Sequence, residues 1–206
     1  MHVEQVGHDN NEAGLHLELI RLRNATETLH RKVETHLDLL RPSFTLDQYV
    51  SLLRRFYGFH QPWESEVDSV LEVELPGFFA PRRKLENIES DLRFLGSEPQ
   101  DLLHIALCGK LPPLKGVGSA LGSLYVIEGS SLGGRILARH FGGHLGLRPD
   151  AGCRFFSGYG GRTGQMWSAF AELMASRPSA ENEDMLEASV ATFELLGDWL
   201  ESEAHD

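Results

Sequence analysis

The stretch that decides the fold is SALGSLYVIEGSSLGGRILARH, residues 119–140. Both of its flanks have the apolar spacing of a helix, with Leu121 and Leu124 before the centre and Ile136 and Leu137 after it. The centre, GSSLGG, holds three glycines, and each costs roughly 1 kcal/mol relative to alanine inside a helix. The segment keeps helical periodicity despite this cost. It is therefore predicted to form a helix in which the glycines serve packing or ligand binding.

Two physical explanations account for these glycines. Gly118, Gly122, Gly129 and Gly133 fall near one face of the expected helix. Glycines on one face let a second helix pack backbone to backbone, or let a flat ligand lie against a bent helix. The residue pattern leaves both explanations open. Conflicts between local propensity and pattern are typical of functional sites.

The rest of the chain is predicted to be helical as well. Apolar residues recur at helical spacing from Leu15 to the proline at 42, and Thr45 with Gln48 forms a capping box that opens a helix to about Leu71. Further helices are expected over residues 82–95, 99–108, 163–176 and 179–203, the last with Ser179 as its N-cap. No alternating β pattern longer than a few residues appears. We therefore expect an all-α, single-domain helical bundle over residues 14–206, after a flexible tail at residues 1–13.

Composition narrows the class of protein. With 206 residues, 41% hydrophobic and 24% charged, the chain fits one globular domain. A net charge of −11 repels phosphate backbones and anionic lipid, so we expect no nucleic-acid and no membrane partner. The N-terminal residues lack the pattern of a signal peptide, and Cys108 and Cys153 are too few for a disulfide framework. These features predict a cytoplasmic protein with reduced thiols.

A stripe on the first helix combines a histidine with a carboxylate. Arg23, Thr26, His30 and Glu34 are spaced by three, four and four residues and so share one face. A histidine whose second ring nitrogen is oriented by a carboxylate is typical of a metal ligand. The same spacing also suits an exposed ion pair.

Other candidates carry weaker signals. His60 lies in an apolar helix and is expected in the core or at its boundary. Phe155, Phe156 and Tyr159, in a glycine-rich loop, are expected to pack rather than to form a stacking platform. No glycine-rich phosphate motif is present.

Taken together, the two motifs resemble the heme oxygenase family, especially its bacterial branch. LRNATETLHRKVE, residues 22–34, is similar to the family's proximal helix, and LYVIEGSSLGG, residues 124–134, is similar to its kinked distal helix. Weaker landmarks are Trp167 with Phe170 and the Ala-Thr-Phe at 191–193. The resemblance implies heme held between a proximal first helix and a kinked, glycine-rich distal helix.

The resemblance also implies a role for each motif residue. His30 would be the iron ligand, Glu34 would orient its ring, and Arg23 would meet a heme propionate, with Thr26 part of the same motif. The glycines Gly129, Gly133 and Gly134 would press the distal backbone against the porphyrin, and the pocket would be lined by Tyr125 and Phe193. Ser130 stands where animal enzymes carry an aspartate, so the source of distal protons is open. Arg162 is the nearest candidate for a second propionate contact.

The function implied is oxidative opening of heme to biliverdin, with release of iron and carbon monoxide. Heme would be both substrate and cofactor, O2 the oxidant, and an external donor such as a ferredoxin or a reductase the source of electrons. The reaction would serve iron acquisition, or its biliverdin would supply the chromophore of a phytochrome. Two alternatives stay open: a non-catalytic heme-binding or heme-trafficking protein on the same fold, and a heme-free helical protein whose glycines serve packing.

Overall fold

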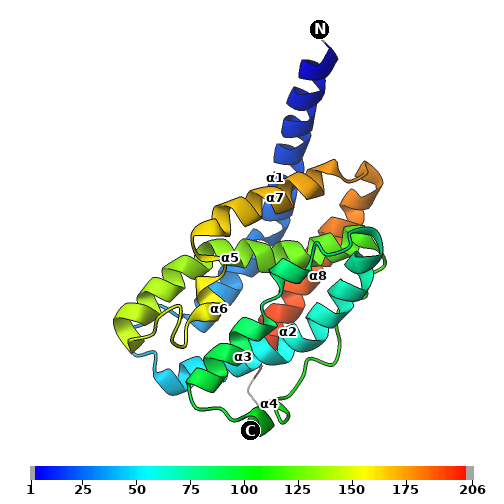
Figure 1. The fold of residues 1–206 in the computed structure, drawn as a ribbon. Helices are drawn as coiled ribbons and strands as arrows, with labels where there is room; N and C mark the ends of the chain where they lie inside the picture. Colours follow the sequence, from blue (N-terminus) through cyan, green and yellow to red (C-terminus); the bar gives the residue numbers. More distant parts are fainter. Residues whose placement is uncertain (1–2, 203–206) are drawn as a thin grey trace.

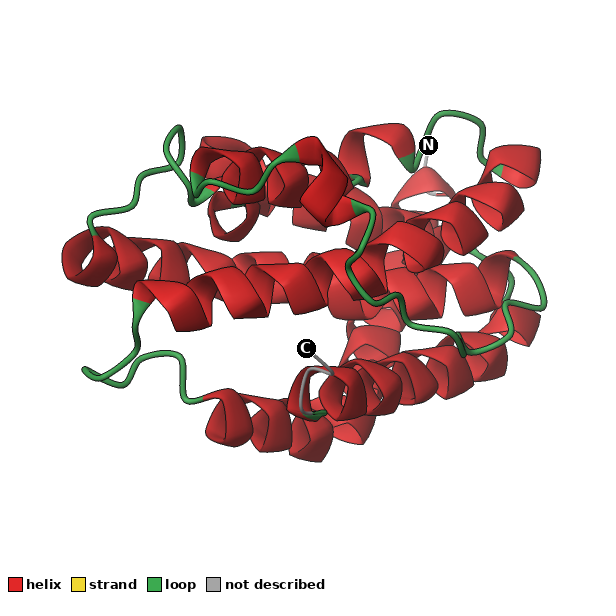
Figure 2. Ribbon diagram, turned by 90° about the horizontal axis from the view of Figure 1, so that it is seen from below, coloured by secondary structure: helices red, strands yellow, loops and turns green. Residues whose placement is uncertain are grey.

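The computed structural model describes the backbone of residues 3–202 and side chains from Leu17 onward. The elements are α1 (Val3–Leu37), α2 (Leu46–Glu74), η1 (Ala80–Arg82), α3 (Leu85–Phe94), α4 (Pro99–Leu102), α5 (Val117–Leu145), α6 (Arg154–Ser157), η2 (Gly160–Arg162), α7 (Thr163–Ser176), η3 (Ser179–Glu181) and α8 (Asn182–Glu201). Residues 3–202 contain helices and loops but no strand, so the predicted all-α class is confirmed (Figure 2). None of the helices in this part of the chain meets the length and hydropathy needed to cross a membrane.

Helix α5 runs through the middle of the bundle and packs most extensively against α8 (Figure 1). This packing uses two of the glycines. A Cβ on Gly122 would lie 2.1 Å from the carbonyl oxygen of Met185, and one on Gly118 would lie 2.9 Å from the Cβ of Glu181. A side chain at either position would push α8 away from α5. The packing explanation therefore holds for the glycines in the first half of α5.

A buried polar contact fixes three helices to one another. The hydroxyl of Ser123 on α5 accepts hydrogen bonds at 2.8 Å from the Trp63 indole on α2 and at 2.8 Å from the Thr192 hydroxyl on α8. All three side chains are buried within the apolar core. Buried hydroxyl and indole groups that satisfy one another fix the relative position of the helices that carry them.

Most predicted helices are confirmed. Thr45 and Gln48 form the expected capping box, and α2 continues through Pro62 to Glu74. The glycine-rich stretch forms one uninterrupted helix, so its glycines do not end it. Helix α7 covers the predicted residues, 163–176.

Several boundaries differ from the sequence predictions. The helix expected over residues 82–95 begins only at Leu85, because Arg82 belongs to η1. Ser179 opens a short 3-10 turn and not α8, whose N-cap is Glu181. The helix expected over residues 99–108 ends at Leu102. Helix α1 begins at Val3, before the first apolar repeat at Leu15, and the flexibility of residues 1–13 stays a prediction.

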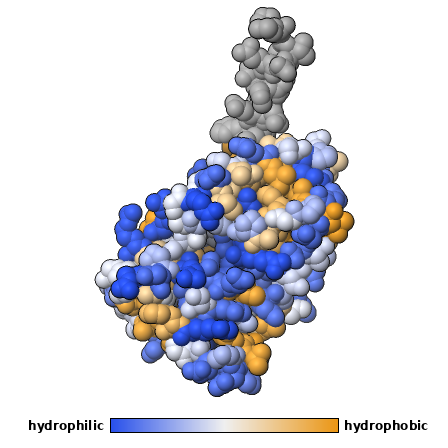
Figure 3. Space-filling model, in the orientation of Figure 1, coloured by the Kyte–Doolittle hydropathy of each residue, from blue (hydrophilic) through white to orange (hydrophobic). Residues whose placement is uncertain are grey.

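The surface of the face shown in Figure 3 is largely hydrophilic, and its apolar side chains lie in separate patches. Both cysteines are buried and unpaired.

Candidate functional site

A cavity of about 660 Å³ lies between α1, α5 and α8. Its first wall consists of side chains of α1 and α8, and its second wall is the glycine-rich centre of α5. An end wall is formed by side chains of α2, by Lys84 and by the aromatic residues of α6. The volume falls in the range of about 300–1,000 Å³ that is usual for cofactor and ligand sites.

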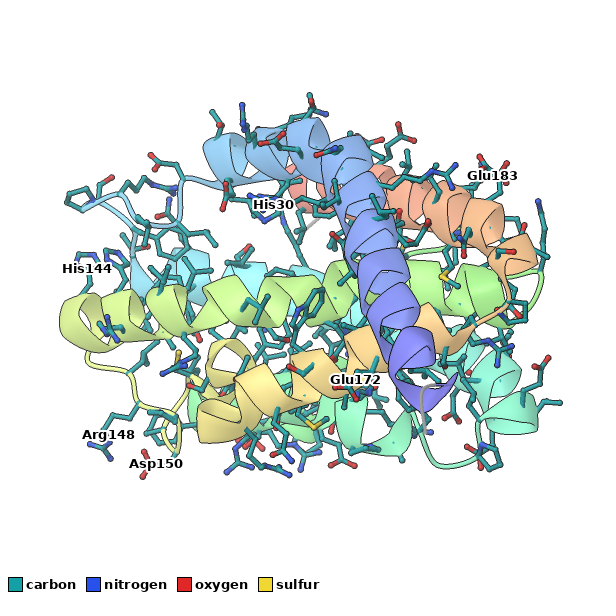
Figure 4. The ribbon with its side chains drawn as sticks, turned by 90° about the horizontal axis from the view of Figure 1, so that it is seen from above. His30, His144, Arg148, Asp150, Glu172 and Glu183 are labelled. Carbon is teal, nitrogen blue, oxygen red and sulfur yellow. The ribbon has the colours of Figure 1, made fainter. Side chains whose placement is uncertain are left out.

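His30 stands on the first wall, on the side of α1 that faces α5 (Figure 4). Its side chain is 52% exposed, and its Nδ1 atom lies 3.3 Å from Oε2 of Glu34. The edge of the ring contacts Phe193 on α8, with 5.7 Å between ring centroids. When Nδ1 donates to the carboxylate, the lone pair resides on Nε2. In that tautomer the pair would present an imidazole with Nε2 free to bind a metal ion.

On the opposite wall, the glycines of α5 divide into two kinds. A Cβ on Gly133 would have no neighbouring atom within 4 Å, and one on Gly129 would make only ordinary contact with Trp167 at 3.9 Å. A Cβ on Gly134, by contrast, would lie 2.6 Å from the carbonyl oxygen of Phe156. Gly133 thus leaves open space at the cavity, whereas Gly134 allows α6 to approach α5. The two explanations drawn from the sequence each apply, to different glycines.

The two serines of the α5 wall already use their hydroxyl protons. Ser130 donates to the carbonyl oxygen of Ile127 at 2.8 Å, and Ser131 donates to the same oxygen at 3.3 Å. Both residues line the cavity. Because each hydroxyl has one proton, either serine can still accept a hydrogen bond from water, but neither has a proton to spare in this arrangement.

Three residues of the predicted site are absent from the cavity lining: Arg23, Thr26 and Tyr125. Thr26 is buried and donates to the carbonyl oxygen of Leu22 at 2.8 Å. Burial raises the pKa of the Tyr125 phenol, and the nearby Thr26 hydroxyl and Arg23 guanidinium act in the opposite direction. The three side chains therefore form one group where α1 crosses α5. Arg162 is also absent from the described lining.

The end wall contains residues that the sequence analysis did not assign to a site. His60 is buried, as expected, and it also lines the cavity, with its Nδ1 atom 3.2 Å from Glu64 Oε1. Phe155 packs against Phe56 with 4.8 Å between ring centroids, and both line the same wall. No local motif marks these residues, because they come together only through tertiary packing.

Lys84 completes the end wall. In the sequence it ends the run Arg82-Arg83-Lys84, which has the composition of a solvated surface segment. In the structure its side chain is 4% exposed. Nothing in the local sequence indicates that this lysine is buried.

Comparison with known proteins identifies the family to which the chain is similar. The heme oxygenase family model matches residues 18–202. A heme oxygenase of Xanthomonas campestris pv. campestris (strain 8004) is 34% identical over 93 residues, which cover 45% of this chain and 52% of that protein. The chain thus spans about half the length of the curated relative that it matches.

Solved structures share the fold. The NO- and CO-bound heme oxygenase from Neisseria meningitidis has a TM-score of 0.72 at 22% identity, with 92% of this chain and 94% of that chain covered. Heme oxygenase 2 from Chlamydomonas reinhardtii, solved without heme, has a TM-score of 0.70 at 19% identity, with 89% and 95% covered. The heme oxygenase from Leptospira interrogans has a TM-score of 0.67 at 18% identity, with 87% and 96% covered.

The family match includes the part of α1 that carries His30 and Glu34, and all of α5 with its glycines. The chain belongs to the heme oxygenase family.

Proposed function

We propose that this protein binds heme in the cavity between His30 and the α5 glycines and opens it to biliverdin. The observation that carries the proposal is the pairing of an oriented imidazole on one wall with bare backbone on the other. When bound, heme supplies the iron at which O2 is reduced and is itself the ring that is opened, with release of iron and carbon monoxide. Membership of the heme oxygenase family supports this activity.

The residues present fit a heme group. The cavity wall is mainly apolar, as a porphyrin face requires, and Gly133 has open space where a side chain would otherwise stand. A neutral imidazole is a usual axial ligand of heme iron. We assign His30 Nε2 as the iron ligand and Glu34 as the acceptor that holds the ring in that orientation.

The backbone of α5 positions the heme from the other side. Because Gly129 and Gly133 carry no side chains, α5 would come close to a bound heme and would restrict where a small molecule can sit beside it. Restricting that position favours reaction at one edge of the ring over random attack. Phe193, in edge contact with His30, holds the proximal imidazole from the α8 side.

Arg23 and Tyr125 are proposed to orient the heme by binding a propionate. The two residues lie near each other, and a guanidinium and a phenol both donate hydrogen bonds to carboxylates. By contrast, Glu34 and Asp38 place carboxylates in the cavity lining, where they repel a propionate. The carboxylates of Glu34 and Asp38 thus disfavour a propionate at their part of the cavity, and we propose Arg23 as one of its partners.

Electrons are proposed to come from an external donor, a ferredoxin or a reductase. The proposed activity is tested by loading the protein with hemin, adding ascorbate and O2, and identifying the extracted pigment by absorption and chromatography. Biliverdin in a yield close to one equivalent supports the proposal. A hemin complex that forms but yields no biliverdin favours the non-catalytic heme-binding alternative, and absence of a complex contradicts both.

A further inference from the structure

Glu128 is a buried carboxylate in the α5 wall that the proposed function does not use. Residues 126–134 of α5 all line the cavity except Glu128. Its side chain is 1% exposed and contacts residues of other elements instead. Glu128 directly precedes Gly129, so whatever holds its carboxylate also holds the backbone that faces the cavity.

Each carboxylate oxygen of Glu128 accepts a hydrogen bond from another element. Arg82, in η1, donates to Oε2 at 2.6 Å, and its side chain is 4% exposed. The hydroxyl of Tyr159, which directly precedes η2, donates to Oε1. The ammonium of Lys84 lies 3.8 Å from Oε1 and adds attraction without a hydrogen bond. Hydrogen bonds to a charged group are the stronger ones, and two of them from different elements fix the position of this carboxylate.

Arg82 also holds the segment of α7 that packs beside Gly129. Its guanidinium donates to the carbonyl oxygen of Met166 at 3.2 Å and 3.3 Å, in addition to its bond with Glu128. The next residue, Trp167, lies beside the glycine, since a Cβ on Gly129 would be 3.9 Å from its ring. One guanidinium thus fixes both sides of the contact between α5 and α7.

The guanidinium of Arg82 is in turn held by aromatic rings. It lies 4.5 Å from the ring centroid of Phe78 and 5.6 Å from that of Phe170. Arginine stacks on aromatic faces, and its planar group has fixed donor directions. A buried ion pair adds little stability compared with apolar side chains of similar size. The pair of Arg82 and Glu128 is better explained by the position that it gives to α5.

No other side chain in this part of the wall provides such an attachment. Within residues 126–134, Glu128 makes the only side-chain hydrogen bonds that reach another element. The hydroxyls of Ser130 and Ser131 donate to the carbonyl oxygen of Ile127, in the same helix. The glycines of the stretch have no side chains and have more conformational freedom than other residues. The α5 wall therefore depends on Glu128 for its polar attachment to the bundle.

We infer that Glu128 is a positioning residue, which holds α5 against the heme and thereby selects the edge of the ring that is opened. This inference rests on the proposed function. Glu128 does not line the cavity, so it acts through the backbone of Gly129 and not by contact with heme. While Arg82 and Tyr159 hold the carboxylate, the wall stays at one distance from the ring. When either donor is lost, α5 moves more freely and selection of one edge weakens.

The test compares four variants of the full chain at pH 7. Glu128→Leu removes both hydrogen bonds, and Tyr159→Phe removes one of them while keeping the ring. Glu128→Gln keeps the shape and an acceptor for Arg82, so it is the conservative variant. Tyr49→Phe is the matched control, because Tyr49 is a buried tyrosine whose hydroxyl donates to the carbonyl oxygen of Gly152 at 2.9 Å and not to Glu128.

Amide hydrogen exchange of the heme-free protein reports how firmly α5 is attached. We expect the peptide that covers residues 126–134 to exchange at least about threefold faster in Glu128→Leu and in Tyr159→Phe than in the parent protein. Glu128→Gln and Tyr49→Phe should exchange at the parent rate in this peptide. If Glu128→Leu does not fold, Tyr159→Phe decides. Exchange at the parent rate in Tyr159→Phe contradicts the inference.

The second readout is the ratio of biliverdin isomers after hemin loading and turnover with ascorbate and O2. We expect the ratio of the principal isomer to the others to fall about tenfold in Glu128→Leu and about threefold in Tyr159→Phe. Glu128→Gln and Tyr49→Phe should retain the parent ratio. A parent protein without a principal isomer contradicts the inference, as does an unchanged ratio in variants whose α5 exchanges faster. If the parent protein forms no biliverdin, the proposed function fails, which the exchange experiment distinguishes because it requires no heme.

Discussion

The Nδ1 atom of His30 lies 3.3 Å from Oε2 of Glu34, one helical turn further along α1. Both side chains are more than half exposed, so this contact adds little to the stability of the helix. A hydrogen bond from Nδ1 to this carboxylate would place the ring proton on Nδ1 and leave Nε2 as the nitrogen available to a metal ion.

Replacement of His30 tests the ligand assignment. His30→Ala should leave the fold intact, because the side chain is half exposed and alanine is the best helix former. Its hemin complex should lose the spectrum of a histidine-ligated heme and give no biliverdin, and added imidazole should restore part of both. His36→Ala is the matched control, on the same helix and outside the described lining. Retention of the parent spectrum by His30→Ala contradicts the assignment, and His60→Ala is then the variant to examine.

Two adjacent glycines should respond in opposite ways to the same substitution. Gly133→Ala adds a methyl group in open space and removes a helix penalty, so the free energy of unfolding of the heme-free protein should rise by up to about 1 kcal/mol. Gly134→Ala places a Cβ 2.6 Å from the carbonyl oxygen of Phe156, so the free energy of unfolding should fall by about 1–3 kcal/mol. Urea unfolding of the two variants gives both values.

A side chain at Gly133 that leaves the heme-free protein stable should nevertheless impair the heme complex. Gly133→Leu fills the space that a porphyrin face needs and should weaken hemin binding or reduce the biliverdin yield, although the free protein stays stable. Equal hemin affinity and equal yield in Gly133→Leu and the parent protein would show that the heme does not lie against this part of α5.

Arg23 should affect the orientation of heme more than its reactivity. Arg23→Glu replaces an attraction for a propionate with a repulsion, worth about 1 kcal/mol at a solvent-screened position, so hemin affinity should fall about fivefold. The mixture of biliverdin isomers should broaden, as chromatography of the product would reveal. Arg31→Glu, an exposed arginine on α1 that pairs with Glu27, should leave both unchanged. An unaltered affinity and isomer ratio in Arg23→Glu would show that Arg23 does not reach the heme.

Removing the buried cation should stabilise the heme-free protein in a defined pH window. The pKa of Lys84 is lowered from 10.5 to about 8, so between these values the unfolded chain binds more protons than the native one. The penalty is complete below pH 8 and disappears as the pH rises toward 10.5. Because Glu128 keeps its hydrogen bonds from Arg82 and Tyr159, Lys84→Met should raise the free energy of unfolding by about 1–3 kcal/mol at pH 7 and by much less near pH 10. A variant that is less stable than the parent protein at pH 7 would indicate a structural role for Lys84.

The sequence predicted the helices that carry the site because their signals are local. The apolar spacing around Gly129 and the capping box at Thr45 depend on neighbours within one or two turns, and both appear in the structure. The stripe that contains His30 and Glu34 is also local, since residues four apart on a helix are neighbours.

The end wall could not be predicted in this way. His60 and Lys84 lie far apart in the sequence, and Phe155 is far from both. Only the packing of α2, the start of α3 and α6 brings them to one cavity. The sequence also could not show which glycines face open space and which contact another element. Gly133 and Gly134 are the same residue type and differ only in what lies opposite them.

The measurement that tests the central claim most directly is the crystal structure of the ferric heme complex. We expect iron bound by Nε2 of His30, with the porphyrin face in van der Waals contact with the backbone at Gly133. Iron bound by another histidine, or heme seated outside the cavity between α1 and α5, would contradict the account.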